Sequence, residues 1–203
     1  MKIAVVGASG NAGSRIVKEL ASRGHAVTAI ARNPEKIASL PHVTAEKGDA
    51  HDRAALAKLL AGHDAAISSI HFLASDPEKL IGAAKDSGVG RYLVVGGAGS
   101  LDVAPGVRLV TTPGFPLQYK AEAEKGAAFL DRLAQEKDLN WTFISPSALF
   151  VPGERTGKFR LGTNQLLTAA DGKSSISFED FAVALGDEIE RPAHIRKRFT
   201  VGY

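Results

Sequence analysis

The chain has 203 residues, enough for one α/β domain with a full core and too few for two. It is 44% hydrophobic and 23% charged with a formal net charge of +3, a balance that does not favour nucleic acid as a partner. The absence of cysteine excludes disulfides, thiolate metal sites and a cysteine nucleophile. No apolar run approaches the ~20 residues of a membrane helix. The chain opens on a core strand rather than a signal peptide, so we expect a cytoplasmic protein.

Residues 2–13, KIAVVGASGNAG, place a short apolar run before three glycines and a helical pattern. This order is typical of the start of a dinucleotide-binding fold. Gly7 permits a tight turn, Gly10 lets backbone N–H groups approach a pyrophosphate, and Gly13 lets the helix pack close to the sheet. The spacing is G-x-x-G-x-x-G rather than G-x-G-x-x-G, and the alternative is an ordinary glycine-rich loop.

The rest of the chain alternates between strand and helix patterns. Strands are predicted at 25–30, 42–46, 65–68, 91–95 and 141–144, and helices at 34–40, 52–60, 76–85 and 119–135. Six repeats of strand then helix predict an α/β fold: a single Rossmann-like domain, residues 1–203, with a doubly wound parallel sheet.

The C-terminal region, about 150–203, departs from this alternation. Residues 165–168 and 175–177 are predicted to form a small hairpin around the Asp171-Gly172 pair, followed by a helix at 178–189 and a last strand at 199–201. Ligands of such sheets lie over the carboxyl ends of the strands. We therefore expect this region to be a small cap on the substrate side.

The residues after the second strand bear on the choice of nucleotide. NAD-preferring sites carry Asp or Glu about 20 residues beyond the glycines. Here the sequence is Ala31-Arg32-Asn33, and Arg32 offers a planar fork suited to a 2′-phosphate. The sequence thus favours NADP(H) over NAD(H), with an exposed loop arginine as the alternative.

Other strand ends carry candidate contacts. We expect the Asp49 carboxylate and the Ala50 backbone at the adenine, with a helix cap by Asp49 or Asp52 as the alternative. We expect the small residues at the ends of the fourth and fifth strands to leave room for the nicotinamide ribose. We expect the residues after the sixth strand to contact the nicotinamide amide. For both sets, the alternative is that these residues only form turns. The full set of expected cofactor-binding residues is Gly7, Ser9, Gly10, Asn11, Ala12, Gly13, Arg32, Asp49, Ala50, Ser68, Ser69, Ile70, Gly96, Gly97, Pro146 and Ser147.

These motifs, with a tyrosine opening the helix at 119–135, resemble the atypical short-chain dehydrogenase/reductase superfamily. Within it the chain resembles the NAD(P)H-binding, NmrA-like branch and the bacterial NADH-flavin reductases, with biliverdin-IXβ/flavin reductase a more distant relative. The most specific segments are WTFISPSA (141–148), PGERTG (152–157) and FTVGY (199–203). The resemblance implies a Rossmann-like fold and NAD(P)H-dependent reduction of a flavin.

One family feature is missing. Members that act on alcohols use Tyr-x-x-x-Lys, in which the lysine helps to lower the tyrosine pKa. Tyr119 is followed at i+4 by Ala123, which disfavours carbonyl chemistry and epimerisation. Flavin reduction tolerates the loss, because hydride passes directly between rings and solvent can supply the proton. Tyr119 remains the candidate catalytic residue, and a helix-start aromatic packed on the loop is the alternative.

Two functions follow. The first is an NAD(P)H-dependent oxidoreductase that passes hydride to a flavin (FMN or FAD as substrate) or another planar acceptor such as a quinone. The second is a non-catalytic NADP(H)-binding redox sensor; an isomerase is disfavoured for lack of a paired acid and base.

We expect a small-molecule partner, no nucleic acid, no membrane and no metal, and a homodimer is compatible with the sequence. His71, near the crevice, is interpreted as a loop residue rather than a proton donor.

Overall fold

A mixed sheet of eight strands runs through the centre of the computed structural model, which describes residues 1–203. All its neighbouring strands pair in parallel except β10, which runs antiparallel to β12 at the edge. The order across the sheet is β10 (Arg160–Gly162), β12 (Lys197–Gly202), β8 (Trp141–Pro146), β5 (Arg91–Val95), β4 (Ala65–Ser68), β1 (Lys2–Val6), β2 (Ala26–Ala31) and β3 (Val43–Lys47). This is the doubly wound α/β fold that the sequence predicts.

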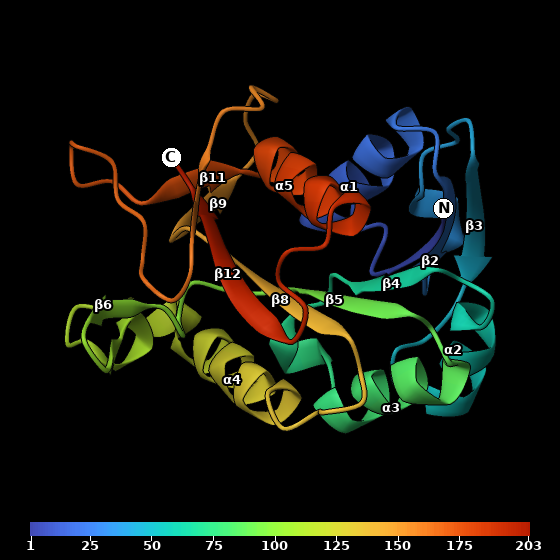
Figure 1. Ribbon diagram of the computed structural model, residues 1–203, viewed down its shortest axis with the longest axis horizontal. Helices are drawn as coiled ribbons and strands as arrows, with labels where there is room; N and C mark the ends of the chain where they lie inside the picture. The colour runs from blue at the N-terminus through green and yellow to red at the C-terminus, as the bar shows by residue number, and fades with distance from the viewer.

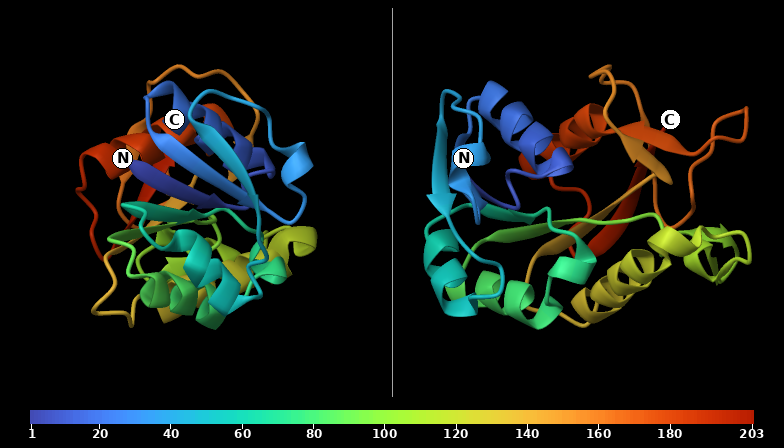
Figure 2. Two further views of the ribbon diagram at one scale, coloured as in Figure 1. Left: turned by 90° about the vertical axis from the view of Figure 1, so that its right-hand side faces the viewer. Right: turned by 180° about the vertical axis from the view of Figure 1, so that it is seen from behind.

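Helices cover both faces of the sheet (Figures 1 and 2). One face carries α1 (Asn11–Ser22) and α5 (Phe178–Glu190), and the other carries α2 (Arg53–Leu60), α3 (Pro77–Ser87) and α4 (Leu117–Leu133). In β1, Ile3 and Val5 enter the core under α1, while Ala4 and Val6 enter the opposite core. A strand buried on both faces explains the unbroken apolar run in the sequence. No helix is both long and apolar enough to span a bilayer.

Side-chain caps set where three helices begin. The Asp52 carboxylate accepts the Ala55 N–H at 3.0 Å, and the Asp76 carboxylate accepts the N–H of Glu78 at 2.9 Å. The Ser177 hydroxyl accepts the N–H of Asp180 at 2.9 Å at the start of α5. Each cap satisfies an amide that the helix itself leaves without an acceptor.

Two local predictions are wrong. The helix expected at 34–40 is only a 3₁₀ turn, η1 (Pro34–Lys36). The expected hairpin does not form, because β11 (Ser175–Ser177) pairs in parallel with β9 (Leu149–Val151). Gln165 instead forms a bridge with Asp102, in the short strand β6 (Asp102–Ala104), which pairs with β7 (Val107–Arg108). These partners are distant in sequence, so local turn residues could not indicate them.

The expected C-terminal cap is smaller than 150–203. The helix α5 packs beside α1 in the same buried cluster, and β12 pairs with β8 inside the sheet. The parts outside the three layers are the irregular segments before and after the edge strand β10, which contain β9 and β11 and lead to α5 (Figure 2).

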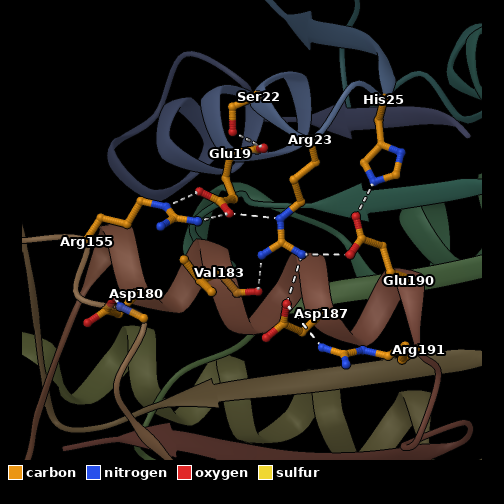
Figure 3. Close-up of polar contacts among 11 residues, drawn as sticks. Glu19, Ser22, Arg23, His25, Arg155, Asp180, Val183, Asp187, Glu190 and Arg191 are labelled. Carbon is orange, nitrogen blue, oxygen red and sulfur yellow. Dashed lines mark hydrogen bonds and ion pairs between the residues drawn. The ribbon is translucent and has the colours of Figure 1, made fainter.

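A cluster of charged residues joins α1, α5 and the loop after β9 (Figure 3). Glu19 is only 5% exposed and accepts Arg23 Nε at 2.8 Å and Arg155 Nε at 2.7 Å. Arg23 continues to the Asp187 carboxylate at 2.9 Å and to the Val183 carbonyl at 3.1 Å. One buried carboxylate therefore links three segments that are distant in sequence.

The loop residues around Arg155 are also held by α5. The Gly153 N–H donates to Glu179 Oε2 at 2.9 Å. The Thr156 hydroxyl and the Gly157 N–H donate to the two oxygens of the buried Asp180 at 2.6 and 2.8 Å. These contacts hold the PGERTG segment, residues 152–157, against α5.

Replacing Glu19 tests the cluster. The hydrogen bond from Arg155, followed by that from Arg23, keeps the pKa of Glu19 below its ordinary value of 4.5 despite burial. A carboxylate with a lowered folded-state pKa contributes stability above its unfolded-state pKa and loses it as pH falls. We expect Glu19→Ala to lower the free energy of unfolding by about 2 kcal/mol at pH 7, measured by urea denaturation.

The gap between wild type and Glu19→Ala should narrow as pH falls below about 4.5. The exposed Glu35 provides the control, and Glu35→Ala should change the free energy of unfolding by less than about 0.5 kcal/mol. A loss in Glu19→Ala that is the same at every pH would show that packing, and not the charge, is responsible.

Candidate functional site

The first three residues of α1, directly after the turn from β1, have backbone amides without a partner in the protein. The Gly10 N–H donates to the Gly7 carbonyl at 3.1 Å. The next amides, those of Asn11, Ala12 and Gly13, have no acceptor within the protein, and no side chain caps this end of α1. Unpaired N–H groups and the partial positive charge of a helix N-terminus form a site for an anion.

The three glycines of the turn have different reasons to lack a side chain. Gly7 has a φ of +84°, and a Cβ there would lie 2.2 Å from the Ser69 carbonyl oxygen. A Cβ on Gly13 would lie 2.2 Å from the Gly7 carbonyl oxygen. Gly10 has ordinary backbone angles, and its nearest neighbour would be the Gly7 oxygen at 3.3 Å. Packing therefore requires Gly7 and Gly13, whereas Gly10 leaves open the space in front of the free amides.

A cavity of about 630 Å³ adjoins these amides, over the carboxyl ends of β4, β5 and β8. Ten of the residues expected from the sequence line it: Gly10, Asn11, Ala12, Ser69, Ile70, Gly96, Gly97, Tyr119, Pro146 and Ser147. Ser68 is buried in β4, and Ser9 is exposed in the turn. Hence residues from five separate parts of the chain meet at one cavity.

Arg32, Asp49 and Ala50 lie outside this cavity. Arg32 is exposed directly after β2, two residues beyond Ile30, whose carbonyl accepts the Gly7 N–H at 3.0 Å. The backbone of Arg32 therefore lies beside the glycine turn. It is on the opposite side of β1 from β4, since β1 separates β2 from β4 in the sheet.

The two carboxylates after β3 have different structural partners. Asp52 caps α2, as described above, and Asp49 Oδ1 accepts the His51 N–H at 2.9 Å. Ala50, between them, is buried. The helix cap thus belongs to Asp52, and the second oxygen of Asp49 has no partner in the protein.

At the position of the lysine in Tyr-x-x-x-Lys, this chain has Ala123, which packs against Gly99. Tyr119 lies in the first turn of α4 and is 62% exposed at the cavity. A Cβ added to Gly99, just after β5, would lie 2.7 Å from the Ala123 Cβ. The Gly99–Ala123 pair brings α4 close to the sheet and leaves no lysine four residues after Tyr119.

The sequence did not indicate the role of Glu122. Its two carboxylate oxygens accept the N–H groups of Phe72 and Leu73 at 2.6 and 2.8 Å, and His71 Nδ1 lies 3.5 Å away. Glu122 therefore holds the 3₁₀ turn η2 (Phe72–Ala74) against α4 at the cavity wall. The one signal for Glu122 in the sequence is its place three residues after Tyr119, on the same face of the predicted helix.

An aromatic wall was also missed. Phe150 and Phe178 line the cavity with ring centroids 4.4 Å apart in an edge-to-face arrangement. The Arg15 guanidinium lies 5.7 Å from the centre of the Phe178 ring and bonds Glu179 at 3.1 Å. Arg15, on α1, thereby supports the wall and is already paired.

Comparisons with known proteins agree with this geometry. A family model described as NAD(P)H-binding matches residues 7–192. The protein YwnB of Bacillus subtilis is 41% identical over 208 residues, covering 99% of this chain and 98% of its own. A Streptococcus pneumoniae structure named as a candidate NADH-flavin reductase is 39% identical with a TM-score of 0.83, covering 100% of this chain and 99% of its own.

A Bacteroides thetaiotaomicron structure named as a candidate epimerase is 39% identical with a TM-score of 0.95, and covers 100% of this chain and 96% of its own. A short-chain dehydrogenase/reductase of Veillonella parvula, solved with NADP, shares the fold at 17% identity and a TM-score of 0.77, covering 100% of this chain and 94% of its own. The resemblance stated from the sequence is thus confirmed at the level of NAD(P)H-binding proteins, and the Veillonella structure adds a likeness of fold alone.

Gly10→Val places a side chain over the free amides while meeting only the Gly7 carbonyl. We expect the fold to be kept and the affinity for both NADPH and NADH to fall by roughly 100-fold or more, because the backbone can no longer approach a pyrophosphate. Calorimetric titration measures the affinity, and thermal unfolding checks the fold. Gly10→Ala should give an intermediate loss, and normal affinity in Gly10→Val would remove the pyrophosphate assignment.

Proposed function

Since the chain belongs to the NAD(P)H-binding family, we propose that it is a reductase that uses NADPH in preference to NADH to reduce a planar acceptor such as a flavin or a quinone. The observation that carries this proposal is the set of free amides at Asn11, Ala12 and Gly13, of which Asn11 and Ala12 belong to residues that line the large cavity. A site for a diphosphate beside a space for two stacked rings is what such a reaction requires.

The residues fit the cofactor along its whole length. The α1 amides would hold the pyrophosphate, Arg32 the 2′-phosphate, and the Asp49-Ala50 turn the adenine. The ends of β4 and β5 (Ser68 to Ile70, and Gly96-Gly97) would leave room for the nicotinamide ribose. Pro146 and Ser147 would contact the nicotinamide amide. The Ser147 hydroxyl is fully buried and has no hydrogen-bond partner in the protein, which supports a ligand contact there.

The nicotinamide would supply a hydride. The protein would position the nicotinamide and the acceptor and would exclude water. Phe150 and Phe178 form an apolar wall against which a planar acceptor can pack. With Ala123 in place of lysine, no lysine stands one turn after Tyr119, and solvent would provide the proton that completes the reduction. Tyr119 would then act at the cavity mouth by contacting the ribose or the acceptor, as its exposure permits.

The direct test is the oxidation of NADPH and NADH, followed by absorbance, with flavins and quinones as acceptors. We expect turnover with at least one planar acceptor and a higher kcat/KM for NADPH. A protein that binds NADPH but is inert with every acceptor would contradict the reductase and support a redox sensor, which must distinguish oxidised from reduced cofactor by binding alone.

Arg32→Ala tests the nucleotide preference. We expect NADPH affinity to fall by roughly 10- to 100-fold, because charge-assisted bonds to the 2′-phosphate are lost, while NADH affinity stays about the same. The exposed Lys36 is the matched control, and Lys36→Ala should leave both affinities unchanged. Equal weakening of both cofactors in Arg32→Ala would contradict the assignment.

A further inference from the structure

We propose that the acceptor is an uncharged planar molecule, a quinone or a flavin without a phosphate, and that the cavity selects against anionic acceptors. The proposal rests on the reductase function proposed above and specifies its substrate class. It follows from the charges around the cavity.

None of the 28 residues that line the cavity is a lysine or an arginine. The ionisable residues among them are His71, Tyr119 and Glu122. Both Glu122 oxygens already accept backbone N–H groups, and His71, 3.5 Å from the carboxylate, adds no uncompensated positive charge. The wall therefore offers no free cation to a phosphate, carboxylate or sulfonate.

Two guanidinium groups come close to the wall from outside, and both are engaged. Arg15 bonds Glu179, as described above. Arg198 donates to the Ser100 carbonyl and hydroxyl at 3.2 Å each and to Asn164 Oδ1 at 3.0 Å, and does not itself line the cavity. Ser100 thus separates the Arg198 charge from the cavity.

The bound cofactor would add negative charge to the same space. Gly10, Asn11 and Ala12, which would hold the pyrophosphate, are lining residues of this cavity. An anionic acceptor would therefore meet the diphosphate and the Glu122 carboxylate without a compensating cation. Like charges in a partly desolvated site repel far more than in water, so the arrangement discriminates by charge.

The mouth of the cavity is apolar as well. Leu73 follows the lining residue Phe72, and Leu117 and Tyr119 open α4; all three are large and exposed. None of these three side chains can form an ion pair with a ribityl phosphate, and all three suit a neutral, apolar molecule.

The reaction balances with NADPH, a proton from water and the acceptor as its reagents. NADPH, one proton from water and riboflavin give NADP⁺ and dihydroriboflavin. The hydride carries two electrons and a proton to the flavin ring, and the C–H bond broken is on the nicotinamide. A quinone is reduced to its hydroquinone with the same balance.

The experiment compares acceptors that share a ring and differ in charge: riboflavin against FMN, and menadione against its sulfonate. NADPH oxidation is measured at about 0.01 M and about 0.15 M salt, where the Debye length falls from about 30 Å to about 8 Å. We expect kcat/KM to be roughly fivefold or more higher for the neutral member of each pair at low salt. Because the selection is electrostatic, the gap should narrow at the higher salt.

Two variants at one position of the cavity wall test the effect of an added positive charge. Ala148 lines the cavity and is exposed, so it is a suitable position for a longer side chain. Ala148→Arg should raise the kcat/KM ratio of FMN to riboflavin to about one or above, whereas Ala148→Gln, similar in length but neutral, should leave the ratio as in the wild type.

The outcomes separate the two proposals. If no acceptor of either charge oxidises NADPH, the reductase function itself is wrong. If turnover occurs but FMN matches or exceeds riboflavin at low salt, the reductase stands and the inference about charge is overturned. Should either variant fail to fold, the wild-type comparison of neutral and anionic pairs still decides.

Discussion

One constraint underlies the proposed function: three amides at the start of α1, those of Asn11, Ala12 and Gly13, have no acceptor within the protein. The fold itself requires Gly7 and Gly13, because an added Cβ on either one would lie 2.2 Å from a backbone carbonyl oxygen. Gly10 is less constrained, because its backbone angles are ordinary and an added Cβ would meet only a tight contact of 3.3 Å with the Gly7 carbonyl oxygen. A glycine whose own packing requires it less strictly is compatible with a ligand that approaches the backbone closely.

The rest of the structure holds that helix end against a large cavity. The buried Glu19 joins α1 to the loop after β9 through Arg155, and Arg15 supports Phe178 in the cavity wall. The cluster of charged residues and the aromatic wall are thus parts of one arrangement, in which α1 is common to both. Displacement of α1 would disturb the diphosphate site and the acceptor side together.

Most of the sheet and the glycine turn could be predicted from the sequence, because the signals are local. The apolar run of β1, the Asp52 cap and the small residues at strand ends each depend on neighbours within a few positions. The pairing of β11 with β9, and the meeting of Phe150 with Phe178, could not be predicted in this way. These contacts arise from tertiary packing between segments more than twenty residues apart, for which one sequence contains no periodic signal.

The most direct measurement is the amide ¹H–¹⁵N NMR spectrum of the protein titrated with NADPH. The account predicts that the signals of Asn11, Ala12 and Gly13 shift most among the amides of α1 and become protected from hydrogen exchange, because each gains a phosphate acceptor. Saturable binding that leaves these three signals in place and unprotected would contradict it.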